Sequence, residues 1–136
     1  MARIAVEIES RPEGNLARVT IQNIAKANCL TSALVGELET AFRGLADDGD
    51  LRLAVLTGEG PRSFIAGANL QELRAFDADT ARAYITGLQR ANQAIRDLPV
   101  PVLARINGAC MGAGLEVAAS CDIRIAADLE IVTERH

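Results

Sequence analysis

The chain has 136 residues, of which 49% are hydrophobic and only 3% are aromatic, and its formal net charge is −4. This composition predicts one folded domain with an aliphatic core and excludes a disordered chain. The negative charge, with Lys26 as the only lysine, argues against nucleic acid as a partner, and no apolar run approaches the roughly 20 residues of a membrane span.

The three cysteines, Cys29, Cys110 and Cys121, are odd in number and lack the spacing of a metal site. This usage is typical of reduced thiols buried as small hydrophobic side chains. Because the N-terminus begins directly in a strand-like pattern rather than a signal peptide, we expect a cytoplasmic protein. His136 is the only histidine, and alone it builds neither a metal centre nor a catalytic triad.

The first elements in chain order form a predicted hairpin. Residues 3–10 alternate, with Ile4, Val6 and Ile8 on one face, and residues 16–21 return after a turn cluster of proline, glycine and asparagine. A half-buried pair of antiparallel strands is therefore expected at the start of the chain.

A helix and a buried strand follow. The helical period begins at Thr31 or Ser32, the candidate N-caps, and ends at the Asp-Asp-Gly sequence after Leu45. Residues 51–57 are apolar except for Arg52, which suits a strand buried on both faces of a parallel sheet.

The second half of the chain continues the alternation of helices and strands. The pattern predicts helices over residues 70–76 and 77–97, a buried strand over 100–106, a short helix over 115–121 and a last strand over 123–126. The order β-β-α-β-α-β-α-β indicates an α/β fold in which helices pack on a mainly parallel sheet.

Two small-residue turns carry the candidate chemistry. The first is Ser63-Phe64-Ile65-Ala66-Gly67-Ala68-Asn69-Leu70, and the second runs from Asn107 through Gly112, Ala113 and Gly114 to Glu116. Each turn leads into a helix, where backbone N–H groups are unpaired and can approach a ligand closely. Together they could bind one developing oxyanion, with Glu116 beside it for proton transfer, which points to an enzyme.

These two motifs resemble the crotonase family, the enoyl-CoA hydratases and isomerases. The family's first pattern is a Phe, small residues and Ala-Gly-Ala-Asp before a helix, and its second is Asn-Gly, a glycine-rich turn and a Glu in a helix that ends near Cys-Asp, here Cys121-Asp122. The resemblance implies an α/β partial spiral of ββα units. It covers residues 1–128 as the N-terminal half of a crotonase-like core, and residues 129–136 form a tail that does not match.

By this resemblance the oxyanion donors are the N–H groups of Ala68 and Ala113, and Glu116 is the first catalytic carboxylate. The implied substrate is an acyl-CoA thioester, with coenzyme A as part of the substrate and no other cofactor, and the implied assembly is a homo-oligomer. Asn69 departs from the family's usual aspartate. The implied substrate-binding residues are Ala66, Ala68, Asn69, Leu70, Gln71, Gly112 and Ala113.

Two alternatives remain open from the sequence. Residues 112–118 also resemble a degenerate dinucleotide-binding fingerprint, although the last small residue is displaced by one. The family's second catalytic glutamate would fall at His136, so the chain is expected to be truncated and inactive alone. It is then either the N-terminal half of a hydratase or a non-catalytic, oligomerising remnant of that fold.

Overall fold

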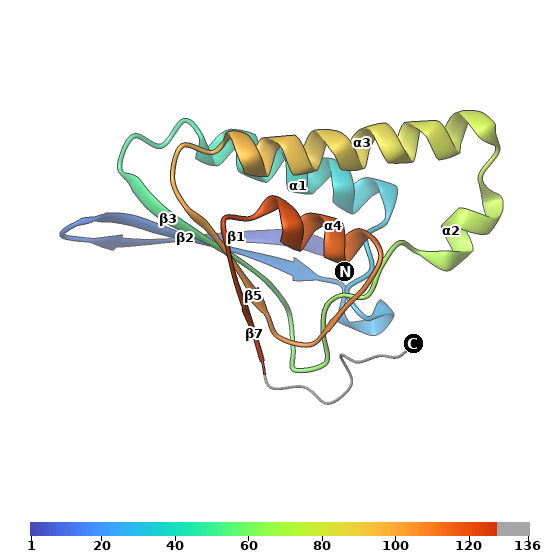
Figure 1. Ribbon diagram of the computed structural model, residues 1–136, viewed down its shortest axis with the longest axis horizontal. Coiled ribbons are helices and arrows are strands. Elements are labelled where there is room, and N and C mark those ends of the chain that lie inside the picture. Colours follow the sequence, from blue (N-terminus) through green and yellow to red (C-terminus); the bar gives the residue numbers. More distant parts are fainter. Residues whose placement is uncertain (128–136) are drawn as a thin grey trace.

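The computed structural model describes residues 1–127, which form a five-stranded sheet with three helices on one face and a second, two-stranded sheet (Figure 1). Each helix and strand expected from the sequence is present. The small strands β4 and β6 and the 3-10 helix were not predicted. In chain order the elements are β1 (Arg3–Arg11), β2 (Gly14–Gln22), a 3-10 helix (Ile24–Lys26), α1 (Ser32–Leu45), β3 (Leu51–Gly58), β4 (Ser63–Ile65), α2 (Leu70–Ala75), α3 (Ala78–Asp97), β5 (Val102–Ile106), β6 (Ala109–Cys110), α4 (Ala113–Ser120) and β7 (Ile123–Ala126).

The main sheet has the strand order β1-β2-β3-β5-β7. β1 and β2 form the predicted antiparallel hairpin, whereas β2, β3, β5 and β7 pair in parallel. Ala54 of β3 lies opposite Val102 of β5, so the two strands expected over residues 51–57 and 100–106 are neighbours in the sheet. The fold is therefore α/β with a mainly parallel sheet, as the element order indicated.

Local sequence signals account for the helix ends. Thr31 is the N-cap of α1, and its hydroxyl accepts the N–H of Leu34 at 3.2 Å. Asp77 and Thr80 form a reciprocal capping box at the start of α3, with both side-chain-to-backbone bonds at 2.8 Å. These caps satisfy backbone donors that a helix leaves unpaired in its first turn.

The core lies between the sheet and the helices and is aliphatic, as the composition predicted. Helices α1 and α3 pack against each other across the sheet, and α4 lies on the same side (Figure 1). The helix-facing residues of the central strands have no solvent exposure; they are Ala17, Val19, Ile21, Ala54, Leu56, Val102 and Ala104. Phe42 of α1 and Phe64 of β4 are also fully buried.

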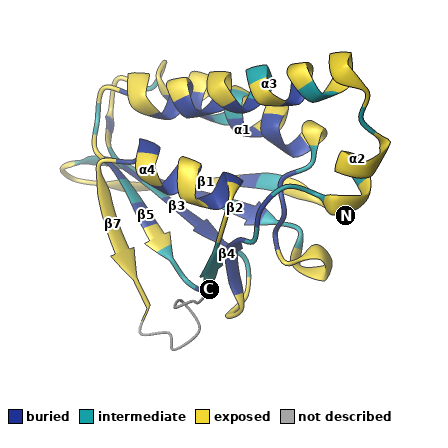
Figure 2. Cartoon of the chain, turned by 45° about the vertical axis from the view of Figure 1, so that its right-hand side comes forward, coloured by how far each residue is buried: buried dark blue, intermediate teal, exposed yellow. Residues whose placement is uncertain are grey.

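The opposite face of the sheet is only partly buried, which corrects the expectation that β3 is buried on both faces. Leu53 and Val55, which alternate with the buried Ala54 and Leu56, are half-buried. Ile123 and Ile125 of β7 are 47% and 56% exposed, and Figure 2 shows the whole strand as exposed. The reason is that α1, α3 and α4 all lie on the same face of the sheet (Figure 1).

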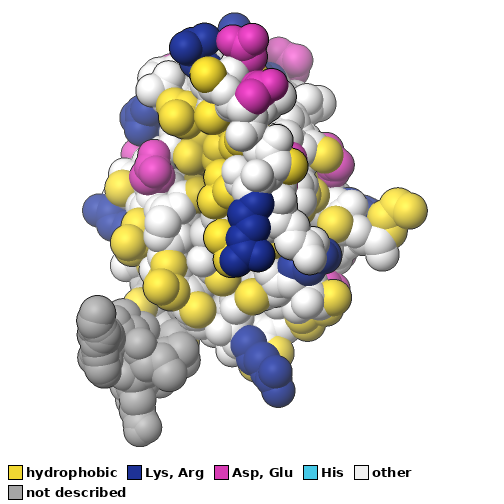
Figure 3. All heavy atoms as spheres, turned by 90° about the vertical axis from the view of Figure 1, so that its right-hand side faces the viewer, with side chains coloured by type: hydrophobic (Ala, Val, Ile, Leu, Met, Phe, Trp, Pro, Cys, Tyr) yellow, Lys and Arg dark blue, Asp and Glu magenta, His cyan; other side chains and the backbone are white. Residues whose placement is uncertain are grey.

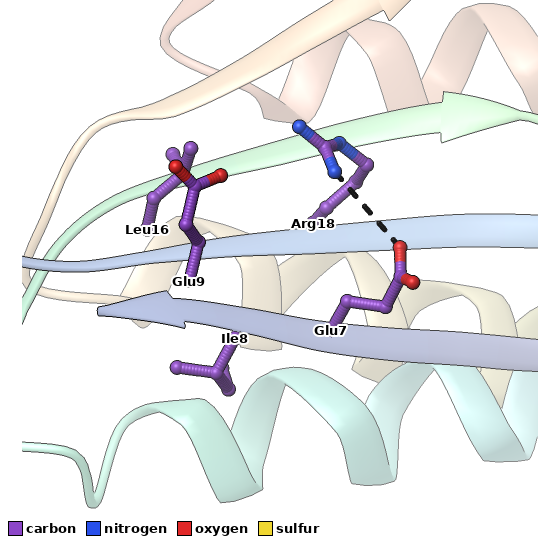
Figure 4. A pocket seen from close by; sticks show the side chains of 5 residues that line it. All are labelled: Glu7, Ile8, Glu9, Leu16 and Arg18. Atoms are coloured by element: carbon purple, nitrogen blue, oxygen red, sulfur yellow. Dashed lines mark ion pairs between the residues drawn. The ribbon is translucent and has the colours of Figure 1, made fainter. Parts of the chain in front are cut away.

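The hairpin alternates as predicted, but its outer part lies beyond the helices. Glu7 and Glu9 point to one side of β1 and Ile8 to the other, and Glu7 pairs with Arg18 across the hairpin at 3.9 Å (Figure 4). Ile8 is therefore 48% exposed although it belongs to the apolar face. These side chains and Leu16 line a shallow depression that contains none of the expected site residues.

None of the helices within residues 1–127 combines the length and the apolar character that crossing a membrane requires. In the same part of the chain, no cluster of three or more His, Cys, Asp or Glu side chains could hold a metal ion.

Candidate active site

The first small-residue turn joins β4 to α2. Gly67 has a φ of +131°, a conformation that glycine adopts without strain. Asn69 is the N-cap of α2, because its Oδ1 accepts the N–H of Glu72 at 2.8 Å. Asn69 thus caps the helix as an aspartate would, so its departure from the family pattern leaves the shape of the turn intact.

The second turn joins β6 to α4. Gly112 has φ +52° and ψ −117°, and its carbonyl oxygen accepts the N–H groups of Leu115 at 3.0 Å and Glu116 at 3.3 Å. The helix begins at Ala113, two residues before the predicted start. Because the turn follows a two-residue strand of the small sheet rather than a strand of the main sheet, it does not have the setting of a dinucleotide-binding fingerprint.

The fold brings the two turns into contact. β4 and β6 pair in parallel, and the N–H of Met111 donates to the Ile65 carbonyl oxygen at 3.2 Å. A Cβ added to Gly112 would lie 3.8 Å from the Cα of Gly67, and one added to Gly114 would overlap the Ile65 carbonyl group. Gly114 must therefore lack a side chain for the second turn to pack against the backbone of the first turn.

Two asparagines hold the strand that leads into the first turn. Asn28 and Asn107 both donate from Nδ2 to the Ser63 carbonyl oxygen, at 2.8 and 2.9 Å. Asn107 also accepts the N–H of Gly58 at 3.0 Å, which ties the end of β3 to the same point. Asn28 is fully buried with a φ of +55°, and it was not predicted as a site residue because no local sequence pattern marks a long-range hydrogen-bonding residue.

The geometry of the peptide groups defines where the two alanine N–H groups point. The Gly67 carbonyl oxygen accepts the N–H of Leu30 at 2.8 Å, and the Gly112 carbonyl oxygen is bonded within α4. In a trans peptide the N–H points opposite to the carbonyl, so the N–H groups of Ala68 and Ala113 point away from these bonds. Within residues 1–127 neither N–H donates to a protein acceptor.

Glu116 lies in the first turn of α4, one turn after Ala113, and its side chain is exposed. The buried phenol of Tyr84 senses its charge. Burial is the main cause that raises the pKa of Tyr84 to about 12, and the charges of Glu72, Cys29 and Glu116 raise it further. The Tyr84 hydroxyl itself donates to the Leu30 carbonyl oxygen at 2.9 Å.

A shallow groove of about 300 Å³ runs beside the first turn. It is lined by the predicted substrate-binding residues Ala66, Ala68, Asn69, Leu70 and Gln71, together with Lys26 and Cys29. Gly112 and Ala113 do not line this groove but lie in the adjoining turn. Lys26 and Cys29 were not predicted as site residues, since only the tertiary structure brings the loop before α1 beside residues 66–71.

The surface around the turns is apolar with basic side chains nearby. Leu70, Met111 and Leu115 are 59%, 60% and 58% exposed, and all three belong to the turns or the helices that follow them. Figure 3 shows this end of the molecule, where hydrophobic side chains form a band with Lys and Arg among them. Such a surface is compatible with a ligand that has an apolar chain and an anionic part.

The cysteines are free thiols, as predicted. Burial raises the pKa of Cys110, and burial together with the Asp122 carboxylate raises the pKa of Cys121 to about 12. These two thiols remain protonated at neutral pH, which is typical of inert, buried cysteines.

The chain is similar to known proteins over most of its length. The family described as enoyl-CoA hydratase/isomerase matches residues 11–133. The short-chain-enoyl-CoA hydratase of Clostridium acetobutylicum is 34% identical over 114 residues, which cover 84% of this chain and 44% of that protein. The crotonyl-CoA hydratase of Syntrophomonas wolfei is 34% identical over 115 residues, covering 85% and 44%.

A solved structure has the same fold. The crystal structure of an enoyl-CoA hydratase from Bacillus anthracis superposes with a TM-score of 0.84 at 31% identity, covering 90% of this chain and 46% of that one. The chain thus spans a little under half the length of these relatives and matches their crotonase fold. The chain belongs to the crotonase family, the enoyl-CoA hydratases and isomerases.

Proposed function

We propose that this chain provides the thioester-binding part of an enoyl-CoA hydratase site. The N–H groups of Ala68 and Ala113 would hold the carbonyl oxygen of a 2-enoyl-CoA while it gains negative charge, and Glu116 would transfer the proton. One observation carries the proposal: two glycine–alanine peptides, in turns brought together by the β4–β6 pairing, have bonded carbonyl groups and N–H groups without an acceptor among residues 1–127.

The chemistry follows from the charge that develops on the thioester oxygen. Addition of water at the β-carbon produces an enolate, and a fixed N–H donor at such an oxygen contributes on the order of 3 kcal/mol in the transition state. Substrate enters with its coenzyme A portion in the groove beside Ala66 to Gln71, where Lys26 supplies a positive charge. The proposal needs no cofactor besides the coenzyme A that the substrate carries.

The reaction also needs a second proton-transferring group, because one group must activate water while another delivers a proton to the α-carbon. Glu72 is near the first turn, but its carboxylate oxygens accept the N–H of Ser32 at 2.9 and 3.2 Å. The position that the resemblance assigns to the second carboxylate, residue 136, lies outside the described residues.

We therefore expect the 136-residue chain to bind and polarise an acyl-CoA thioester but to hydrate crotonyl-CoA at a rate near background. Glu116→Gln should then change the hydration rate little. The rate is measured from the loss of enoyl absorbance, with Glu39→Gln on α1 as a matched control. Robust hydration that Glu116→Gln abolishes would contradict this expectation.

The thioester-binding step itself is tested with acetoacetyl-CoA, whose enolate absorbs in the near ultraviolet. The purified chain should raise the enolate fraction of this ligand at constant pH, because the two N–H donors stabilise the anion. Coenzyme A without an acyl group should bind through the groove and produce no such absorbance. If the chain binds coenzyme A but never raises the enolate fraction, the pair of donors is not an oxyanion site.

We also infer that the chain works in the cytoplasm and self-associates. The free thiols support the location in the cytoplasm. Self-association is supported by β7, an edge strand within the described residues whose apolar side chains are exposed. Sedimentation at micromolar concentration should show dimers or larger species, and Ile125→Lys should reduce them more than Val6→Lys on the opposite edge strand. A monomer at every concentration would contradict self-association. Recovery of the chain from the secreted fraction would contradict the cytoplasmic location.

A further inference from the structure

Tyr84 is a buried polar side chain that the proposed reaction does not use. It lies on α3, is 8% exposed, and donates its hydroxyl to the Leu30 carbonyl oxygen at 2.9 Å. Its ring also contacts that of Phe76, the C-cap of α2, with centroids 5.7 Å apart. One side chain of α3 therefore contacts both the segment before α1 and the end of α2.

Leu30 connects Tyr84 to the first candidate donor. The N–H of Leu30 donates to the Gly67 carbonyl oxygen at 2.8 Å, and Leu30 and Ala68 form an isolated parallel bridge. The Gly67 carbonyl and the Ala68 N–H belong to the same planar peptide, so a bond that fixes the carbonyl also fixes the direction of the N–H. The Tyr84 hydroxyl restrains the other side of Leu30, at its own carbonyl group.

The segment of residues 27–32 is held in place by several further hydrogen bonds. The N–H of Ala66 donates to the Ala27 carbonyl oxygen at 3.2 Å, next to the Leu30–Gly67 bond. The Glu72 carboxylate accepts the N–H of Ser32, which links α2 to the start of α1. Leu30 itself has no solvent exposure, so its carbonyl group needs a protein partner, and Tyr84 supplies one.

We propose that Tyr84 is a positioning residue of the oxyanion site: by holding the Leu30 carbonyl group, its hydroxyl keeps Leu30 paired with the Gly67–Ala68 peptide and so directs the Ala68 N–H toward the ligand. The inference rests on the proposed function. A tyrosine phenol is protonated at neutral pH, and the pKa of Tyr84, which burial raises to about 12, extends its role as a donor to alkaline pH.

The test compares Tyr84→Phe, which retains the ring, with the wild-type chain. The enolate fraction of bound acetoacetyl-CoA should fall about 3- to 10-fold, a change on the scale of one modest hydrogen bond. The affinity for coenzyme A alone should stay the same, since Tyr84 does not line the groove. Thr40→Val on α1, which also removes a hydroxyl bonded to a carbonyl group, is the matched control and should leave the enolate fraction unchanged.

Amide hydrogen exchange gives a readout that needs no ligand. Exchange of the Leu30 N–H should accelerate in Tyr84→Phe and the Ala68 resonance should shift, whereas the Ala113 resonance should not. If Tyr84→Phe lowers only the unfolding temperature and leaves the enolate fraction and these resonances unchanged, Tyr84 is merely structural and the proposal is wrong. A wild-type chain that raises no enolate fraction instead rejects the proposed function, and this inference with it.

If Tyr84→Phe does not fold, a measurement on the chain that retains Tyr84 still tests the proposal. Tyr84 is the only tyrosine of the chain, so biosynthetic 3-fluorotyrosine labels it alone. Its fluorine resonance should shift when acetoacetyl-CoA binds and should not shift with coenzyme A alone. An identical response to both ligands would overturn the positioning role.

Discussion

Replacing Ala113 with proline should lower the equilibrium constant for enolate formation of a bound thioester by about 10²–10³-fold, the effect of losing one oxyanion donor. Proline has no backbone N–H, so Ala113→Pro removes the candidate donor and adds only a small ring. The enolate fraction of bound acetoacetyl-CoA measures the effect. A variant with side-chain changes alone could not test the donor, because it belongs to the backbone.

The fold should tolerate this substitution. Ala113 is the first residue of α4, the helical position at which proline is accepted because the N–H there has no partner within the helix. Ala78→Pro is the matched control, since Ala78 is the first residue of α3 and lies outside both turns. An unchanged enolate fraction in Ala113→Pro, with far-ultraviolet dichroism like that of the wild type, would exclude Ala113 as a donor.

Phe64→Ala should lower the free energy of unfolding by roughly 3–5 kcal/mol, the usual cost of deleting a buried phenylalanine side chain. Phe64 has no solvent exposure and lies in β4, directly before the first turn, so the deletion leaves a cavity under the site. A domain of ordinary stability has about 5–15 kcal/mol in total, so the variant should be marginally folded.

Urea unfolding followed by circular dichroism measures this loss. Ile85→Ala is the control: Ile85 is 55% exposed on α3, and its truncation should change the free energy of unfolding by no more than about 0.5 kcal/mol. A loss for Phe64→Ala as small as that of the control would show that β4 does not contribute to the core. Such a result would also mean that packing of Phe64 does not hold the first turn in place.

Some element bounds follow closely from the sequence because their causes are local. The helix predicted over residues 77–97 forms over Ala78–Asp97, since Asp77 and Thr80 cap it and the apolar period continues to its end. The strand predicted over residues 100–106 begins at Val102, after Pro101, which has no N–H for a sheet bond. By contrast, β4 and β6 are too short for any periodic pattern, and they exist because each supplies the other's hydrogen bonds.

The extent of burial depended on tertiary packing. The apolar run of residues 51–57 is the same whether one or both faces of the sheet are covered, so the sequence could not distinguish these cases. Likewise, Lys26 and Cys29 carry no local signal of a site, and they reach the groove through the pairing of residues 27–30 with residues 66–68. Tyr84 carries no sequence signal of its contact either, because its partner Leu30 lies 54 residues away.

The sequence by itself determined the order of the elements, the family, and the two glycine–alanine turns with Glu116 after the second. These are encoded locally: capping residues, apolar periods and glycines with positive φ act within a few residues of the chain. The tertiary structure alone decided that the turns meet and how each donor is oriented. Those features depend on hydrogen bonds between distant segments, such as Met111 with Ile65 and Leu30 with Gly67, which form only when the β4–β6 pair and the helices are packed together.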